Sequence, residues 1–173
     1  QQHKHEVRVQ LRPRYNLKES LGREFTPIDI QQARRQWKEH RITYGMAPFA
    51  PALLTAPEGN LKLDKTQAYG LTLSPANLSG FNTCAHSTIG CRDACLNLTG
   101  KGMYNATQAR RIVKTRFLYE NPRAFATILL HEIAQAYEKY GKDLRMRLNV
   151  LSDLRWEEIL PQVFEIAPRA NFY

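Results

Sequence analysis

The sequence of 173 residues is long enough for one domain with a hydrophobic core, and 43% of it is apolar and 24% charged, as in ordinary globular proteins. It contains no run of about 18 apolar residues, so we expect no transmembrane helix and no membrane partner. The net charge of +9 is compatible with an acidic partner such as nucleic acid. Residues 1–46 and 101–123 each carry a net charge of +5 and are the candidate nucleic-acid surfaces, with a solvated basic surface as the alternative.

Residues 1–52 are interpreted as a basic N-terminal extension that ends in a Pro-rich arm. Alternating polar and apolar residues over 6–11 predict a short strand. Thr26, which is followed by proline, predicts the N-cap of a helix that runs to about His40. Three prolines between residues 45 and 57 then indicate a connecting arm.

Residues 53–173 are interpreted as the main domain, in which strands and helices alternate. The expected elements are a strand at 68–73, a loop at 76–102, helices at 104–119 and 122–140, a strand at 144–151, a helix at 154–166 and a strand at 170–173. This order predicts an α/β fold with a partial, half-barrel-like parallel sheet built from βα repeats. Because the chain ends in a strand-like segment, we expect it to be cut short at its C-terminus.

The three cysteines, Cys84, Cys91 and Cys95, lie within 12 residues in the loop that follows the first core strand. An odd number of closely spaced cysteines without a secretory signal argues against a disulfide framework, so we expect reduced thiols in the cytoplasm. Thiolates select iron–sulfur clusters, zinc or copper(I). Three thiolates on a [4Fe–4S] cluster leave one iron open to a small-molecule ligand, whereas His86 could complete a Cys3His zinc site. Cysteines acting as small buried hydrophobic residues are the third interpretation.

A second group of polar residues follows the strand after the long helices. Arg147 and Asn149 share one face of that strand, and polar side chains inside a sheet are costly unless they have partners. They therefore predict a polar cavity with Ser152 and Asp153 at its rim, and an exposed edge strand followed by a helix N-cap is the alternative. Since the carboxyl ends of parallel strands meet at one edge, we expect the cysteine loop and Ser152-Asp153 to lie together as a cofactor site.

Several sequence strings carry a family resemblance. They are Gly59-Asn60-Leu61-Lys62, Leu73-Ser74-Pro75, Ser79-Gly80, the cysteine loop, Arg147-Leu148-Asn149, Ser152-Asp153, Trp156-Glu157 and Asn171-Phe172-Tyr173. Over residues 53–173 the chain resembles the phage and prophage proteins called gene product 88-like. The resemblance implies a phage protein in the cytoplasm of a bacterial host and leaves its activity open.

The strand, the three-cysteine loop, the helix and the strand ending in Ser152-Asp153 also resemble the opening of radical S-adenosylmethionine enzymes. The resemblance implies a cubane cluster on the three cysteines, with S-adenosylmethionine on its open iron and Ser152-Asp153 near the methionine amine. That family has C-x3-C-x2-C where this sequence has C-x6-C-x3-C, so whether the chain is an enzyme is left open. The leading hypothesis is a phage-type iron–sulfur protein. The alternative is a non-enzymatic basic phage protein that binds nucleic acid or a host partner and has a structural zinc loop.

Overall fold

Among the described residues, three short strands and three long helices form the frame of the fold. A computed structural model describes residues 16–46, 52–59 and 66–173. The helices are α1 (Leu17–Ser20), α2 (Ile30–Thr43), α3 (Ile89–Asp93), α4 (Asn105–Glu120), α5 (Pro122–Tyr140), α6 (Trp156–Ile159) and α7 (Gln162–Glu165). The strands are β1 (Ala68–Gly70), β2 (Arg145–Arg147) and β3 (Asn171–Phe172), and the 3-10 turns are η1 (Pro57–Gly59), η2 (Leu96–Leu98), η3 (Gly100–Met103) and η4 (Gly141–Asp143).

The sheet is parallel and has the order β1-β2-β3. Met146 in the central strand aligns with Tyr69 on one side and with Phe172 on the other. The expected α/β fold with a parallel sheet is confirmed. In the part of the chain that the structure describes, these strands form a small sheet that does not show the half-barrel-like shape. The first two strands are also shorter than expected, since β1 ends at Gly70 and β2 at Arg147.

Helix α5 has the bounds that the sequence predicts, because both of its ends carry local signals. Pro122 occupies the first turn, where a missing N–H costs nothing, and Gly141 caps the other end with a φ of +53°. The helix expected at 154–166 is instead two short helices, α6 and α7. Pro161 separates them, since a proline lacks the N–H that a continuous helix requires.

Helix α2 begins three residues later than Thr26 predicts. Its N-cap is Asp29, whose side chain accepts a hydrogen bond from the backbone N–H of Gln32 at 2.9 Å. The segment before α2 bonds to α5 instead of forming the first turn of the helix. The N–H of Ile28 donates to the hydroxyl of Thr127 on α5 at 3.1 Å. A contact between residues 99 positions apart therefore overrides the local capping signal.

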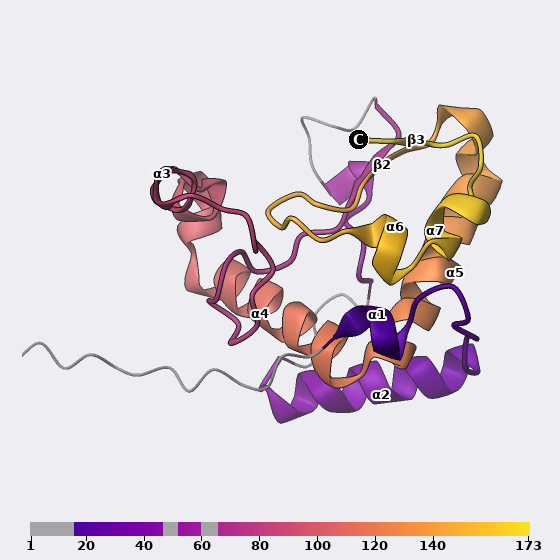
Figure 1. Ribbon diagram of the computed structural model, residues 1–173, viewed down its shortest axis with the longest axis horizontal. Coiled ribbons are helices and arrows are strands. Elements are labelled where there is room, and N and C mark those ends of the chain that lie inside the picture. Colours follow the sequence, from indigo (N-terminus) through magenta and orange to yellow (C-terminus); the bar gives the residue numbers. More distant parts are fainter. Residues whose placement is uncertain (1–15, 47–51, 60–65) are drawn as a thin grey trace, which may run out of the picture.

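One hydrophobic core joins α2, α4, α5 and the sheet (Figure 1). Trp37 of α2 packs on Phe117 of α4, with ring centroids 4.7 Å apart. The largest fully buried side chains are Trp156, Phe117, Phe125, Leu53, Leu71, Leu73, Leu118, Leu129, Ile133, Leu144, Met146 and Leu160. Residues 17–46 thus pack on the main domain, and the boundary at residue 52 stays a prediction. The strand expected at 6–11 and much of the Pro-rich arm lie outside the described residues.

Candidate metal centre

Cys84 lies where the loops after β1 and β2 meet. Its side chain is buried, and its sulfur accepts a hydrogen bond from the N–H of Ala76 at 3.2 Å. The Cys84 thiol also donates a hydrogen bond of 3.4 Å to the carbonyl oxygen of Leu151, which lies in the loop after β2. Next to it, the N–H of Asp153 donates to the carbonyl oxygen of Thr83 at 2.8 Å. The structure therefore brings the start of the cysteine loop and the loop containing Asp153 together at one sheet edge, as the sequence predicts.

Helix α4 holds the segment between β1 and Cys84 in place. The hydroxyl of Thr115 accepts from the N–H of Ser74 at 2.8 Å, and Arg116 donates to the carbonyl oxygen of Ser79 at 2.9 Å. Tyr119 stacks on Phe81 with ring centroids 4.5 Å apart and donates to the backbone of the same loop. Burial raises the pKa of Tyr119 to about 12, and nearby Cys84 acts in the same direction.

Cys91 and Cys95 belong to a lobe, residues 85–104, that projects beside the N-terminal end of α4 (Figure 1). Thr88 caps α3 by accepting a hydrogen bond from the N–H of Cys91 at 3.1 Å. Cys91 is exposed and Cys95 is partly buried. Within the lobe only Asn97 and Gly102 are buried. Its large apolar side chains are exposed, namely Ile89, Leu96, Leu98, Met103 and Tyr104.

Two polar side chains of α4 anchor this lobe. Gln108 donates to the carbonyl oxygens of Asn97 and Gly102, each at 2.8 Å, and accepts from the Asn97 amide at 2.9 Å. Arg111 donates to the side-chain oxygen of the same asparagine. Burial lowers the pKa of Arg111, and the electrostatic effect of Cys95 opposes that shift. The lobe is thus fixed through polar contacts rather than through an apolar core.

These α4 residues are not among the predicted site residues, although the sequence carries a signal for them. Gln108, Arg111, Thr115 and Tyr119 recur at three- and four-residue spacing, so they lie on one helix face. That face meets the cysteine loop. A polar stripe at helical spacing directly after a cysteine loop could have indicated an internal polar contact.

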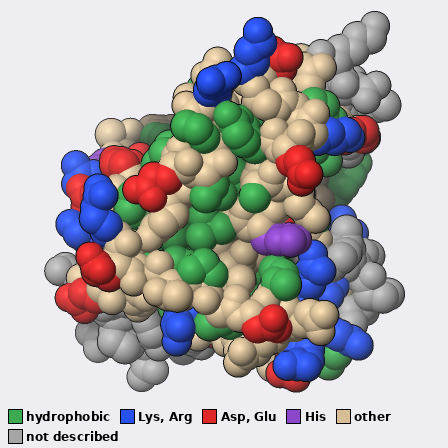
Figure 2. Space-filling view, turned by 90° about the vertical axis from the view of Figure 1, so that its right-hand side faces the viewer, with side chains coloured by type: hydrophobic (Ala, Val, Ile, Leu, Met, Phe, Trp, Pro, Cys, Tyr) green, Lys and Arg blue, Asp and Glu red, His purple; other side chains and the backbone are tan. Residues whose placement is uncertain are grey.

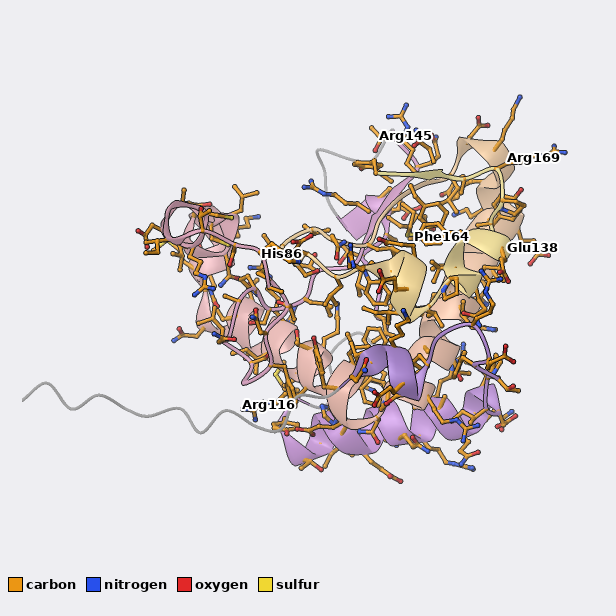
Figure 3. All side chains as sticks on the ribbon, in the orientation of Figure 1. His86, Arg116, Glu138, Arg145, Phe164 and Arg169 are labelled. Carbon is orange, nitrogen blue, oxygen red and sulfur yellow. The ribbon has the colours of Figure 1, made fainter. Side chains whose placement is uncertain are left out.

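The three thiols do not form a completed ligand set in this conformation. All three cysteines are free, and among the described residues no group of three or more His, Cys, Asp or Glu side chains could hold a metal ion. His86 is exposed near the start of the lobe (Figure 3). The donor chemistry fits a thiolate-bound metal, whereas the position of the lobe would have to change to bring Cys91 and Cys95 to Cys84.

Asn149 organises the loop after β2. Its side-chain oxygen accepts from the Ser152 hydroxyl at 2.9 Å, from the Leu154 N–H at 3.1 Å and from the Trp156 indole at 3.1 Å. Its amide nitrogen donates to the Leu154 carbonyl oxygen at 2.8 Å. The predicted cofactor-binding residue therefore has four hydrogen bonds inside its own loop, and a ligand contact by Asn149 stays a prediction.

Arg147 lies on the exposed face of the central strand. It and Arg145 flank Met146, which is buried on the other face. The regular strand ends at Arg147, so Asn149 lies in the following bend and not on the same strand face. The side chain of Asp153 is exposed beside the cysteine loop. The structure thus joins Leu151 and Asp153 to Cys84 and Thr83 and leaves Arg147 on the sheet surface.

Comparison with protein families identifies the relatives of this chain. The model of the gene product 88 family matches residues 50–173, which include β1, the cysteine loop and the rest of the sheet. The chain belongs to the gene product 88 family. No curated protein and no solved structure matches it significantly.

Membership in the gene product 88 family supports the expectation of a phage protein. Within the described ranges, every helix is too short or too polar to cross a membrane.

Proposed function

We propose that this gene product 88 family member binds an iron–sulfur cluster through Cys84, Cys91 and Cys95. The observation that supports this most is the lobe of residues 85–104, which buries no apolar side chain. Small modules without a hydrophobic core commonly depend on a bound metal for their folded conformation. In this proposal, metal binding draws the lobe toward Cys84.

One contact of Cys84 suits a bound thiolate, and metal binding would replace the hydrogen bond that its thiol donates to Leu151. The N–H of Ala76 already points at its sulfur, and a hydrogen bond of this kind stabilises negative charge on sulfur. A metal-bound sulfur could keep this hydrogen bond, which is of the kind that backbone amides make to ligating thiolates.

A cluster with three protein ligands would leave one iron accessible to a small molecule. The candidate neighbours of that ligand are Ser152 and Asp153, since the N–H of Asp153 is bonded to the residue before Cys84. S-adenosylmethionine is the ligand that the second resemblance implies, with Asn149 and Arg147 as further candidate contacts. A perturbation of the cluster spectrum by added S-adenosylmethionine would support this finer proposal, and an unchanged spectrum would count against it.

Anaerobic reconstitution with iron and sulfide tests the cluster. The wild-type protein is expected to develop a broad charge-transfer absorbance near roughly 400 nm. Cys91→Ala is expected to lose it, whereas His86→Ala should retain it because the proposal gives His86 no ligand role. A Cys91→Ala variant that retains the full absorbance, or a colourless wild-type protein with one bound zinc, would overturn the proposal.

A second candidate function is nucleic-acid binding, favoured by the exposed Arg34, Arg35 and Lys38 of α2. The block at 101–123 contributes less, since Arg111, Lys114 and Arg116 donate hydrogen bonds inside the protein. Basic and acidic side chains are interspersed around an apolar centre on the face in Figure 2. Affinity for duplex DNA that falls steeply with salt would support this function, and no binding at low salt would exclude it.

A further inference from the structure

A cavity of about 450 Å³ lies between α2, residues 52–56 and α4. This volume is in the range of small-molecule sites, which are lined mainly by hydrophobic side chains. The described residues that line the cavity all lie outside the cysteine loop. The cavity is therefore a separate feature that takes no part in the proposed metal centre.

The wall of the cavity is mainly apolar. Its apolar members among the described residues are Trp37, Met46, Ala52, Leu54, Ala56 and Val113. Trp37, Leu54 and Val113 are buried and belong to the hydrophobic core, so the wall is continuous with that core. Ala52 and Thr55 on the loop side are exposed, and a ligand would enter from this side.

The polar groups that line the cavity already have partners in the protein. Lys114 donates to the carbonyl oxygen of Leu53 at 2.6 Å, and the guanidinium of Arg41 lies over the ring of Trp37, 5.3 Å from its centroid. Arg110 also has an interaction partner. The backbone N–H and carbonyl oxygen of Thr55 are bonded to Gly70. Apolar surface is thus what the cavity offers to a ligand.

The loop side of the wall is held in place from α5. The carboxylate of Glu132 accepts hydrogen bonds from the N–H groups of Leu53 and Leu54 at 2.8 to 3.1 Å. Lys114 holds the carbonyl oxygen of Leu53 from α4. Because these bonds fix the backbone at residues 53–54, the side chain of Leu54 lines the cavity before any ligand binds.

We propose that this cavity binds an uncharged, hydrophobic small molecule. Such a molecule gains free energy when it leaves water for an apolar wall. A charged molecule of the same shape would lose its hydration, and it would have to compete with the existing contacts of Arg41, Arg110 and Lys114 for compensation. The wall therefore selects against charge.

Fluorescence titration with N-phenylnaphthylamine tests the proposal, because the emission of this uncharged probe rises in apolar surroundings. The bound probe is then displaced with naphthalene or with naphthoate, which carries an additional carboxylate. Naphthalene is expected to displace it at about one tenth or less of the concentration that naphthoate needs. Displacement reports on the occupied site alone, so binding of naphthoate elsewhere on this basic protein does not contribute.

Two substitutions at lining positions locate the bound probe. Val113→Phe and, independently, Ala56→Phe place a ring in the cavity and should each weaken probe binding by about tenfold or more. Ile112→Phe is the matched control, since Ile112 is the neighbour of Val113 on α4 and does not line the cavity. Cys91→Ala should bind the probe like the wild type, so this proposal and that of the metal centre fail separately.

Each variant is first shown to unfold cooperatively above the temperature of the titration, and Ala56→Phe alone decides if Val113→Phe does not fold. Three results would overturn the proposal. They are no binding of the probe to the wild type, displacement by naphthoate at the same concentration as by naphthalene, and equal probe affinities of Ala56→Phe and Ile112→Phe.

Discussion

The N–H of Asp153 and the carbonyl oxygen of Thr83 form a hydrogen bond of 2.8 Å that ties the loop after β2 to the residue before Cys84. The thiol of Cys84 bonds to Leu151 at the same place. Two loops that are distant in the sequence therefore share one rigid junction. A change in either loop is expected to affect the other.

Replacing Asn149 should test its role in the loop after β2. Asn149→Ala removes four hydrogen bonds and is expected to lower the free energy of unfolding by about 2–4 kcal/mol, measured by urea denaturation. Asn149→Asp keeps the accepting oxygen and should cost less. An Asn149→Ala protein as stable as the wild type would show that these bonds contribute nothing.

The arrangement at this sheet edge could be predicted because it depends on topology. Strands that are parallel place their following loops at the same edge, and both loops are visible in the sequence. The bounds of α5 were likewise predictable from Pro122 and Gly141, since each acts within one turn. The break between α6 and α7 could also have been predicted, because Pro161 lies inside the segment 154–166 that was expected to form a single helix.

The remaining features depend on contacts that no local pattern encodes. Glu132 bonds to the backbone of a residue 79 positions away, and Lys114 bonds to the same residue across 61 positions. For this reason the sequence predicts residues 101–123 as a candidate nucleic-acid surface or a solvated basic surface. Lys114 and Arg116 instead donate to backbone carbonyl oxygens of segments that reach α4 from elsewhere in the chain.

The cysteines should differ in reactivity before any metal is bound. Cys91 is exposed and should react quickly with a maleimide, whereas Cys84 is only 8% exposed and should react slowly until the protein unfolds. Mass spectrometry of peptides after timed labelling would measure both rates. Labelling of Cys84 as fast as that of Cys91 would contradict the described junction.

Gly102 is expected to be required for the lobe. A Cβ atom at Gly102 would lie 2.9 Å from the carbonyl oxygen of Leu96, so Gly102→Ala should shift the backbone and destabilise the lobe by about 1–3 kcal/mol. Gly90→Ala is the matched control, since its nearest neighbour, the Thr88 hydroxyl, is 4.0 Å away. Amide hydrogen exchange over residues 96–104 should accelerate in the first variant alone. Unchanged protection in Gly102→Ala would refute the packing described.

Lys114 should make the stability of the protein depend on pH. Its pKa is about 8 in the folded protein against 10.5 normally, so between these values the unfolded chain binds more protons at this position. The free energy of unfolding therefore rises with pH across this window, by at most about 3 kcal/mol. The free energy of unfolding of the wild type is compared with that of Lys114→Met, by denaturation at both ends of this pH window. The difference between the two proteins should show this rise. Lys38→Met is the control, and a difference that stays flat would contradict the burial of Lys114.

Metal content is the most direct test of the central claim that Cys84, Cys91 and Cys95 bind an iron–sulfur cluster. Iron, acid-labile sulfide and zinc are measured in wild-type and Cys91→Ala proteins purified without oxygen. We expect about four iron and four sulfide per wild-type chain, and a large loss of both in the variant. Stoichiometric zinc without sulfide, or equal iron in the two proteins, would contradict it.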